Sequence, residues 1–154
     1  MIELLKESSL FGGCTPEQLE KVAALCERCT YPAGASICEA AAPADHLHVI
    51  ERGIVELSFT LTCYGATQQI TTDRMGRGDV VGWSSFTTAG TFTLSATASS
   101  DVTLLRILTA DLDELFADSH FGHVVMRSLA GIIAQRFTIM QRMLIDMLQD
   151  RVVR

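Results

Sequence analysis

Between residues 31 and 108 the sequence consists of short β-type runs, and this spacing is what most limits the fold. The runs are rich in Val, Ile, Leu, Thr and Phe, and Gly, Pro, Asp or Ser separates one from the next. They read SIC, LHVIER, IVELSFTLTCY, QQITTDR, VVGW, TFTLSATA and VTLLRIL. Strands at such close, regular spacing indicate a closed or nearly closed β-barrel or a β-sandwich.

The longest run predicts a strand with one buried face, because its alternate residues are apolar and the others are more polar or small. The alternating residues are Val55, Leu57, Phe59, Leu61 and Cys63.

Helical patterns flank the β-type region on both sides. Thr15 can cap a helix, Pro16 suits its first position, and Gln18 can complete a capping box. This helix is expected to end near residues 28–30, ahead of a proline. A short helix is expected at residue 109, followed by a long helix from about residue 119 to the C-terminus. We therefore predict a mainly β fold with flanking helices in one domain (1–154). Its parts are an N-terminal helical part (1–30), a β-roll (31–108) and C-terminal helices (109–154).

The long helix carries an apolar stripe that predicts a homodimer. About thirty helical residues span ~45 Å, more than the predicted β-core can cover. An uncovered stripe would be an apolar patch that monomers rarely tolerate, so pairing with a second copy is expected. In the alternative, the whole stripe packs on the β-barrel. Arg136 and Asp150 interrupt the stripe. The predicted dimer residues are Met126, Leu129, Ile133, Met140, Met143 and Met147.

Composition and charge exclude several functions. With 154 residues, 48% of them hydrophobic, the chain suits one globular domain. A net charge of −6 and only twelve scattered basic residues argue against nucleic-acid binding. With no secretory signal or long apolar run, we expect a cytoplasmic protein without a membrane span. No nucleophile elbow, Walker loop or HExxH motif is present, so no enzyme activity is expected.

Three segments occur in an order and spacing that resemble a known family. They are YPAGASI (31–37), ADHLHVIERGIVELSF (44–59) and GRGDVVGW (76–83). Together they resemble the cyclic-nucleotide-binding domain, the sensory β-roll of the CRP/FNR transcription regulators. The resemblance implies a jelly roll that binds a small effector and signals through its C-terminal helix. Gly34, Gly53 and Gly78 would lie at strand corners, where positive φ favours glycine.

The resemblance also implies a DNA-reading helix-turn-helix after the long helix. This chain stops at Arg154, so we expect no direct nucleic-acid contact by the chain itself.

The phosphate-binding cassette (here residues 78–95) is where the chain departs from the family. Nucleotide-binding members continue with F-G-E and then R-x-A-T; the Glu binds the ribose 2′-hydroxyl and the Arg pairs with the cyclic phosphate. Here these motifs read Val81-Gly82-Trp83 and, from Phe92 to Ser95, FTLS. No Lys or Arg lies between Arg77 and Arg106. A buried phosphate without a cation is unstable, so the effector is not expected to be cAMP or cGMP. A basic side chain reaching the cavity from elsewhere in the chain, or from a second copy, would overturn this inference.

The mixture of aromatic and small hydroxyl residues in the cassette suits a neutral or weakly polar small molecule of unknown identity. In the alternative, the aromatic rings fill the site and leave a ligand-free dimerisation or interaction module. The predicted ligand-binding residues are Gly82, Trp83, Ser84, Ser85, Phe92 and Thr93.

A thiol-based redox or iron–sulfur sensor is a third alternative, because a cluster requires four thiolates and four cysteines lie in the N-terminal quarter. Their spacing differs from that of the oxygen-sensing members, and two of them occupy apolar positions typical of core thiols. No cofactor or metal is therefore expected. His46 and His48 alternate on one strand but lack a third ligand for zinc or haem. The four cysteines are Cys14, Cys26, Cys29 and Cys38.

Overall fold

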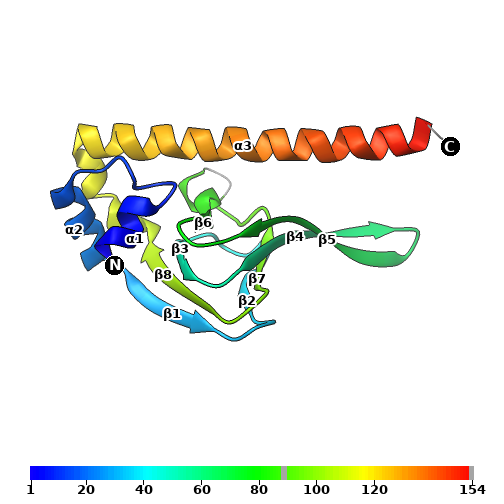
Figure 1. Cartoon of the computed structure of the whole chain (residues 1–154), viewed down its shortest axis with the longest axis horizontal. Helices are drawn as coiled ribbons and strands as arrows, with labels where there is room; N and C mark the ends of the chain where they lie inside the picture. The colour runs from blue at the N-terminus through cyan, green and yellow to red at the C-terminus, as the bar shows by residue number, and fades with distance from the viewer. Residues whose placement is uncertain (88–89, 153–154) are drawn as a thin grey trace.

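The computed structural model describes residues 1–87 and 90–152, in which two four-stranded antiparallel sheets form a β-roll. Helices α1 and α2 lie at one end of the roll, and α3 runs along one side (Figure 1). The strand orders are β1-β8-β3-β6 and β2-β7-β4-β5. This is the predicted jelly roll with flanking helices. The strands are β1 (Glu27–Tyr31), β2 (Ser36–Cys38), β3 (His46–Arg52), β4 (Val55–Cys63), β5 (Ala66–Met75), β6 (Val80–Val81), β7 (Ser95–Ala98) and β8 (Val102–Leu108). The α-helices are α1 (Ile2–Glu7), α2 (Pro16–Ala24) and α3 (Ser119–Val152), and the 3-10 helices are η1 (Trp83–Phe86), η2 (Thr109–Leu112) and η3 (Leu115–Ala117).

Each of the seven predicted β-type runs contains a strand, so the sequence pattern located β2 to β8 correctly. The three corner glycines also have the expected backbone, with φ of +87° at Gly34, +90° at Gly53 and +83° at Gly78. These corners let the chain reverse between strands where a Cβ would be strained.

The N-terminal part differs from the prediction. The capping box of α2 is present, with the Gln18 backbone N–H donating to Thr15 Oγ1 at 3.3 Å and the Thr15 N–H to Gln18 Oε1 at 2.9 Å. However, α2 ends at Ala24, and the residues expected to continue it form β1 instead. All five β1 residues pair with β8, and these inter-strand bonds outweigh the local helical preference. The short helix α1 was not predicted.

Two apolar cores hold the fold together. One lies between the helices and the β1-β8-β3-β6 sheet, and the other fills the inside of the roll. Phe121 of α3 is fully buried in the first core and stacks on Phe11 with ring centroids 6.4 Å apart. Asp118 starts α3, because its Oδ1 accepts the backbone N–H of His120 at 2.9 Å and of Phe121 at 3.4 Å. These contacts anchor the first turns of α3.

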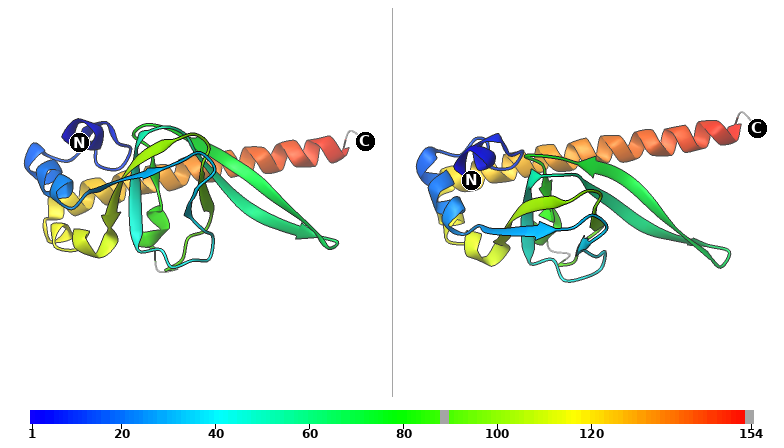
Figure 2. Two further views of the ribbon diagram at one scale, coloured as in Figure 1. Left: turned by 90° about the horizontal axis from the view of Figure 1, so that it is seen from below. Right: turned by 60° about the horizontal axis from the view of Figure 1, so that its bottom comes forward.

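The outer part of the β4–β5 hairpin lacks the buried face that alternation predicted. Val55 and Leu57 are buried, but Leu61 is 45% exposed and Cys63 is also exposed. A bulge between Leu57 and Ser58 shifts the register. The hairpin leaves the roll on the side toward which α3 runs, so no second layer covers it (Figure 2).

The long helix α3 presents two apolar stripes. Its 34 residues span ~51 Å at 1.5 Å per residue, and its C-terminal half extends beyond the roll (Figures 1 and 2). Despite this length, no helix in the described part of the chain is apolar enough to cross a membrane. One stripe faces the roll, and a second, displaced by about 100° around the helix, is exposed. The roll-facing stripe comprises Phe121, Val125, Leu129, Ile132, Arg136, Ile139 and Met143, and the exposed stripe Met126, Ile133, Phe137, Met140, Leu144 and Met147.

Two of the predicted dimer residues lie on the roll-facing stripe. Leu129 is only 6% exposed because it packs into the core of its own chain, and Met143 is half-buried on the roll-facing side. The other four predicted residues are exposed or at the edge of the roll contact.

Candidate functional site

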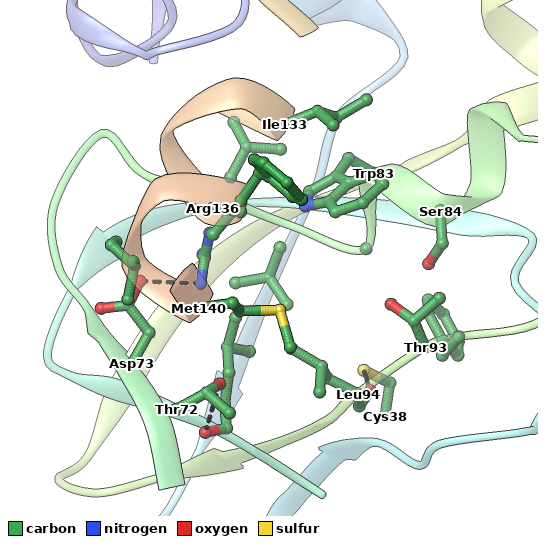
Figure 3. Close-up of a pocket in the computed structure, with 17 residues that line it drawn as sticks. Cys38, Thr72, Asp73, Trp83, Ser84, Thr93, Leu94, Ile133, Arg136 and Met140 are labelled. Atoms are coloured by element: carbon green, nitrogen blue, oxygen red, sulfur yellow. Dashed lines mark hydrogen bonds and ion pairs between the residues drawn. The ribbon is translucent and has the colours of Figure 1, made fainter. Parts of the chain in front are cut away.

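A cavity of about 370 Å³ lies between the cassette and α3; we call it the helix pocket (Figure 3). The cassette supplies one wall, α3 the opposite wall, and β4 and β5 the floor. Its lining is mostly aliphatic and aromatic, which suits a ligand with a large apolar surface. The lining residues are Cys38, Leu57, Thr72, Asp73, Val80, Val81, Gly82, Trp83, Ser84, Phe92, Thr93, Leu94, Ile133, Arg136, Phe137, Ile139 and Met140.

Five of the six predicted ligand-binding residues line this pocket, and Ser85 does not. The cavity also shows that the rings of Trp83 and Phe92 do not seal the site. Gly82 holds the turn at φ +87°, where an added Cβ would lie 2.7 Å from the His46 carbonyl oxygen. The cassette thus keeps a tight glycine turn followed by a short helix, η1.

Two backbone donors of the cassette bond within the turn itself. The Ser85 N–H donates to the Gly82 carbonyl at 3.0 Å, and the Thr87 N–H donates to the Ser84 carbonyl at 3.0 Å. These bonds do not use the N–H groups of Trp83 and Ser84, the first two residues of η1. The start of a helix is where backbone N–H groups can meet an anion.

One basic side chain does reach the pocket, contrary to the expectation that none would. Arg136, on α3, enters between Trp83 and Met140, and its Nη1 donates to Asp73 Oδ2 at 2.8 Å (Figure 3). Its Nη2 lies 2.8 Å from Met75 Sδ. The side chains of the ion pair are only 14% and 24% exposed. A cation thus reaches the cavity from a segment distant in sequence, and this overturns the inference drawn from the cassette alone. What Arg136 can bind depends on its pairing with Asp73. The sequence pointed to Arg136 only as a charged residue that interrupts the apolar stripe of the long helix.

The ion pair changes what Arg136 can bind. An anionic ligand would have to share Arg136 with Asp73, whose negative charge weakens the attraction of the guanidinium for a second anion. The pocket therefore contains a cation whose charge is already compensated inside the protein.

The thiol in the pocket is unreactive. Burial raises the pKa of Cys38 to about 11, and its Sγ lies 4.0 Å from the Leu94 carbonyl oxygen. Burial likewise raises the pKa of Cys14 and of Cys26 to about 11. Because the thiolate is the reactive form, these residues behave as small apolar side chains.

The four cysteines considered for a cluster are not brought together. In residues 1–87 and 90–152, no three His, Cys, Asp or Glu side chains come close enough to hold a metal ion. Cys14 and Cys26 belong to the helix-side core, Cys38 to the core inside the roll, and Cys29 to strand β1. The described geometry therefore gives no support to a four-cysteine cluster.

A row of phenylalanines connects the cassette with the start of α3. Phe86, at the end of η1, meets Phe116 edge-on with centroids 5.9 Å apart, and Phe116 meets Phe121 at 5.4 Å. The three rings form a continuous packed contact between η1 and the start of α3.

Comparisons with known proteins agree with this architecture. A sequence model of the cyclic nucleotide-binding domain matches residues 28–119, more than half of the chain. No curated protein sequence matches. A putative cyclic nucleotide-binding protein from Geobacter metallireducens GS-15 has 29% identity and a TM-score of 0.71, with 88% of this chain and 96% of that chain covered.

Two further solved structures have similar folds. The catabolite activator protein of Thermus thermophilus has 27% identity and a TM-score of 0.72, covering 92% of this chain and 63% of its own. The N-terminal domain of a transcriptional regulator from Streptomyces coelicolor A3(2) has 24% identity and a TM-score of 0.71, with 89% and 94% covered. The matched segment, the jelly roll and the long helix together show that this chain belongs to the cyclic nucleotide-binding domain family of CRP/FNR-like regulators.

Proposed function

We propose that this chain is a sensory, non-catalytic domain whose helix pocket binds a neutral, largely apolar small molecule instead of cAMP or cGMP. The observation that carries the proposal is the lining of the pocket. Aromatic and aliphatic side chains surround it, and the cation in its wall, Arg136, is paired with Asp73. A ligand without charge leaves this pair intact and gains from apolar burial.

The effector's signal would pass to α3. The pocket lies directly between the cassette and α3, and the Phe86–Phe116–Phe121 row packs η1 against the start of that helix. A ligand that prefers one position of α3 would shift the population toward it. The exposed stripe of α3 would relay the change to a second copy of the chain.

The first test uses Trp83, the chain's sole tryptophan, as a reporter inside the pocket. The neutral apolar fluorophore N-phenyl-1-naphthylamine is expected to quench Trp83 saturably by energy transfer. Thr93→Phe fills the pocket and should weaken this binding at least tenfold. Thr60→Phe, the same change on the exposed hairpin, should leave it unchanged. Quenching that does not saturate, or that both variants share, would contradict the proposal.

The second test concerns charge. Isothermal titration with cAMP or cGMP is expected to show no binding at micromolar concentrations, because Arg136 is already paired. Asp73→Asn removes the carboxylate that pairs with the Arg136 guanidinium. Relative to the unaltered chain, the ratio of the affinity for the anionic fluorophore 1-anilinonaphthalene-8-sulfonate to that for the neutral fluorophore should rise about tenfold, or 1.4 kcal/mol. Asp113→Asn is the matched control, because it removes an exposed carboxylate that does not line the helix pocket. A saturable cAMP isotherm with the unaltered chain would refute the ligand class.

The third test concerns the dimer. Sedimentation at tens of micromolar is expected to give twice the mass of the chain. Leu144→Glu places a charge on the exposed stripe and should weaken dimerisation by at least about 100-fold, since a buried unpaired charge costs about 3 kcal/mol or more. Gln135→Glu introduces the same residue on the opposite side of α3 and should have no effect. A monomer for the unaltered chain would contradict the proposed role of α3.

A further inference from the structure

A second cavity, of about 320 Å³, lies at the end of the roll where β1, β3 and β8 meet; we call it the histidine pocket. Its polar side chains are those of Tyr31, His46, His48 and Arg106, with others at the rim. Phe92 and Cys38 separate it from the helix pocket, and no residue of α3 lines it. An apolar cavity of about 150 Å³ holds a benzene molecule, so this one is large enough for a small ligand.

The deepest polar group in the histidine pocket lacks a partner. The His48 side chain is almost fully buried, with the residue only 3% exposed. Its Nδ1 has no hydrogen-bond partner among the described residues. An unsatisfied buried nitrogen costs about 1–3 kcal/mol. A bound ligand that accepts a hydrogen bond at this position would remove that cost.

The neighbours of His48 are basic. Arg106 is its direct cross-strand partner on β8, so both side chains project from the same face of the sheet. Arg106 donates through Nη2 to Glu27, and no partner for Nε or Nη1 is found in the described part of the chain. The His46 ring stacks beside His48 with centroids 6.4 Å apart. Two imidazoles and a guanidinium therefore line one cavity, and of the three only His48 is buried.

The acidic groups lie farther out. Glu39 and Asp45 also line the cavity, but both are exposed, and Asp45 Oδ1 is held by His46 Nδ1 at 2.5 Å. This contact orients His46 with its Nε2 free to face a ligand. The carboxylates are thus more exposed than His46, His48 and Arg106, which supply the hydrogen-bond donors of the cavity.

We propose that the histidine pocket is a second ligand site, one that binds a small oxyanion between Arg106, His48 and His46. The oxyanion would accept hydrogen bonds from the unused guanidinium N–H groups and from the imidazole of His48. Charge-assisted bonds of this kind are about twice as strong as neutral ones. This site is independent of the ligand proposed for the helix pocket.

Binding at this site takes up a proton. Burial, together with the charges of His46 and Arg106, lowers the pKa of His48 to about 4 in the empty pocket. A bound anion stabilises the imidazolium, so it raises this pKa, and by linkage the anion binds more tightly as the pH falls. The charged groups that act on His48 are His46 of β3, Arg106 of β8 and Asp45. Tyr31 of β1, Cys38 of β2 and Glu39 line the same cavity, and Glu27, Cys29 and Tyr31 of β1 act on Arg106.

The experiment follows the imidazole signals of ¹⁵N-histidine-labelled protein by NMR during titration with sodium sulfate and, separately, sodium acetate. Sodium chloride of equal ionic strength is the reference. The two oxyanions keep their charge between about pH 5.5 and pH 7.5. We expect saturable shifts of His48 with an affinity that rises severalfold as the pH falls through this range. Tighter sulfate binding would indicate a tetrahedral ligand such as a phosphate, and tighter acetate binding a carboxylate.

Two variants locate the site. Arg106→Gln should weaken oxyanion binding at least tenfold, whereas Arg77→Gln, an exposed arginine paired with Glu7, should not change it. Thr93→Phe, which fills the helix pocket, should also leave it unchanged, which separates this proposal from the first. Shifts that equal those of chloride, an affinity independent of pH, or equal effects of the two arginine variants would overturn the proposal. The titration of the unaltered chain decides the matter even if Arg106→Gln does not fold.

Discussion

Replacing Gly53 with alanine is expected to lower the free energy of unfolding by about 3 kcal/mol. Gly53 joins β3 to β4 at φ +90°, which an L-residue adopts only at a cost. The added Cβ would lie 2.4 Å from the Asp101 carbonyl oxygen and 2.7 Å from Val102 Cγ1. These neighbours are a backbone atom and a buried core side chain, so neither can move aside without disturbing the start of β8. Urea denaturation at neutral pH measures the loss.

Gly34→Ala is the matched control. Gly34 has nearly the same backbone, with φ +87°, but no atom lies within 4 Å of the position that a Cβ would take. Gly34→Ala should therefore lower the free energy of unfolding only by the cost of placing an alanine at positive φ, about 1 kcal/mol. Equal losses in the two variants would show that the contact with Asp101 is unimportant.

Acid is expected to destabilise the fold through His48. Its pKa is about 4 in the folded chain, below the ordinary value of 6.5, because the imidazole is buried beside His46 and Arg106. Above pH 6.5 both the folded and unfolded forms are neutral, and the group contributes nothing. Between pH 6.5 and about 4 only the unfolded chain binds the proton, so stability falls by up to about 3 kcal/mol across this window.

His48→Phe isolates this contribution, since it keeps a ring in the roll and removes the titration. The variant should lose less stability than the unaltered chain between pH 7 and pH 5, by about 2 kcal/mol in urea denaturation. His123→Gln, which removes an exposed histidine on α3, should follow the unaltered chain. Parallel pH profiles for all three proteins would exclude His48 as the acid-sensitive group.

The two histidine predictions are linked. A sulfate or acetate ion bound beside His48 would stabilise the protonated ring and should reduce the acid loss of the unaltered chain, because a ligand that binds only the folded form stabilises it. The same ions should have no such effect on His48→Phe.

Local patterns predicted those parts of the fold that depend on neighbours in sequence. The runs that became β2 to β8, the capping box at Thr15 and the three corner glycines were all read correctly, since each depends on a few adjacent residues. Strand β1 was missed because Glu27–Tyr31 has no clear period of its own and is a strand only by pairing with β8. Alternation in β4 was misleading beyond Leu57, where the hairpin leaves the roll.

In the candidate site, too, some features follow from local sequence and others only from tertiary packing. The sequence by itself determined the glycine turn at Gly82 and predicted that Trp83 and Phe92 line the site, since these positions lie within one short segment. Only the tertiary structure decided that Arg136 enters the pocket, that Asp73 compensates its charge, and that His48 and Arg106 share the inside of the roll. Each of these facts joins residues from different elements. Local sequence cannot specify such contacts, because sheet register and helix rotation are set by the packing of the whole chain.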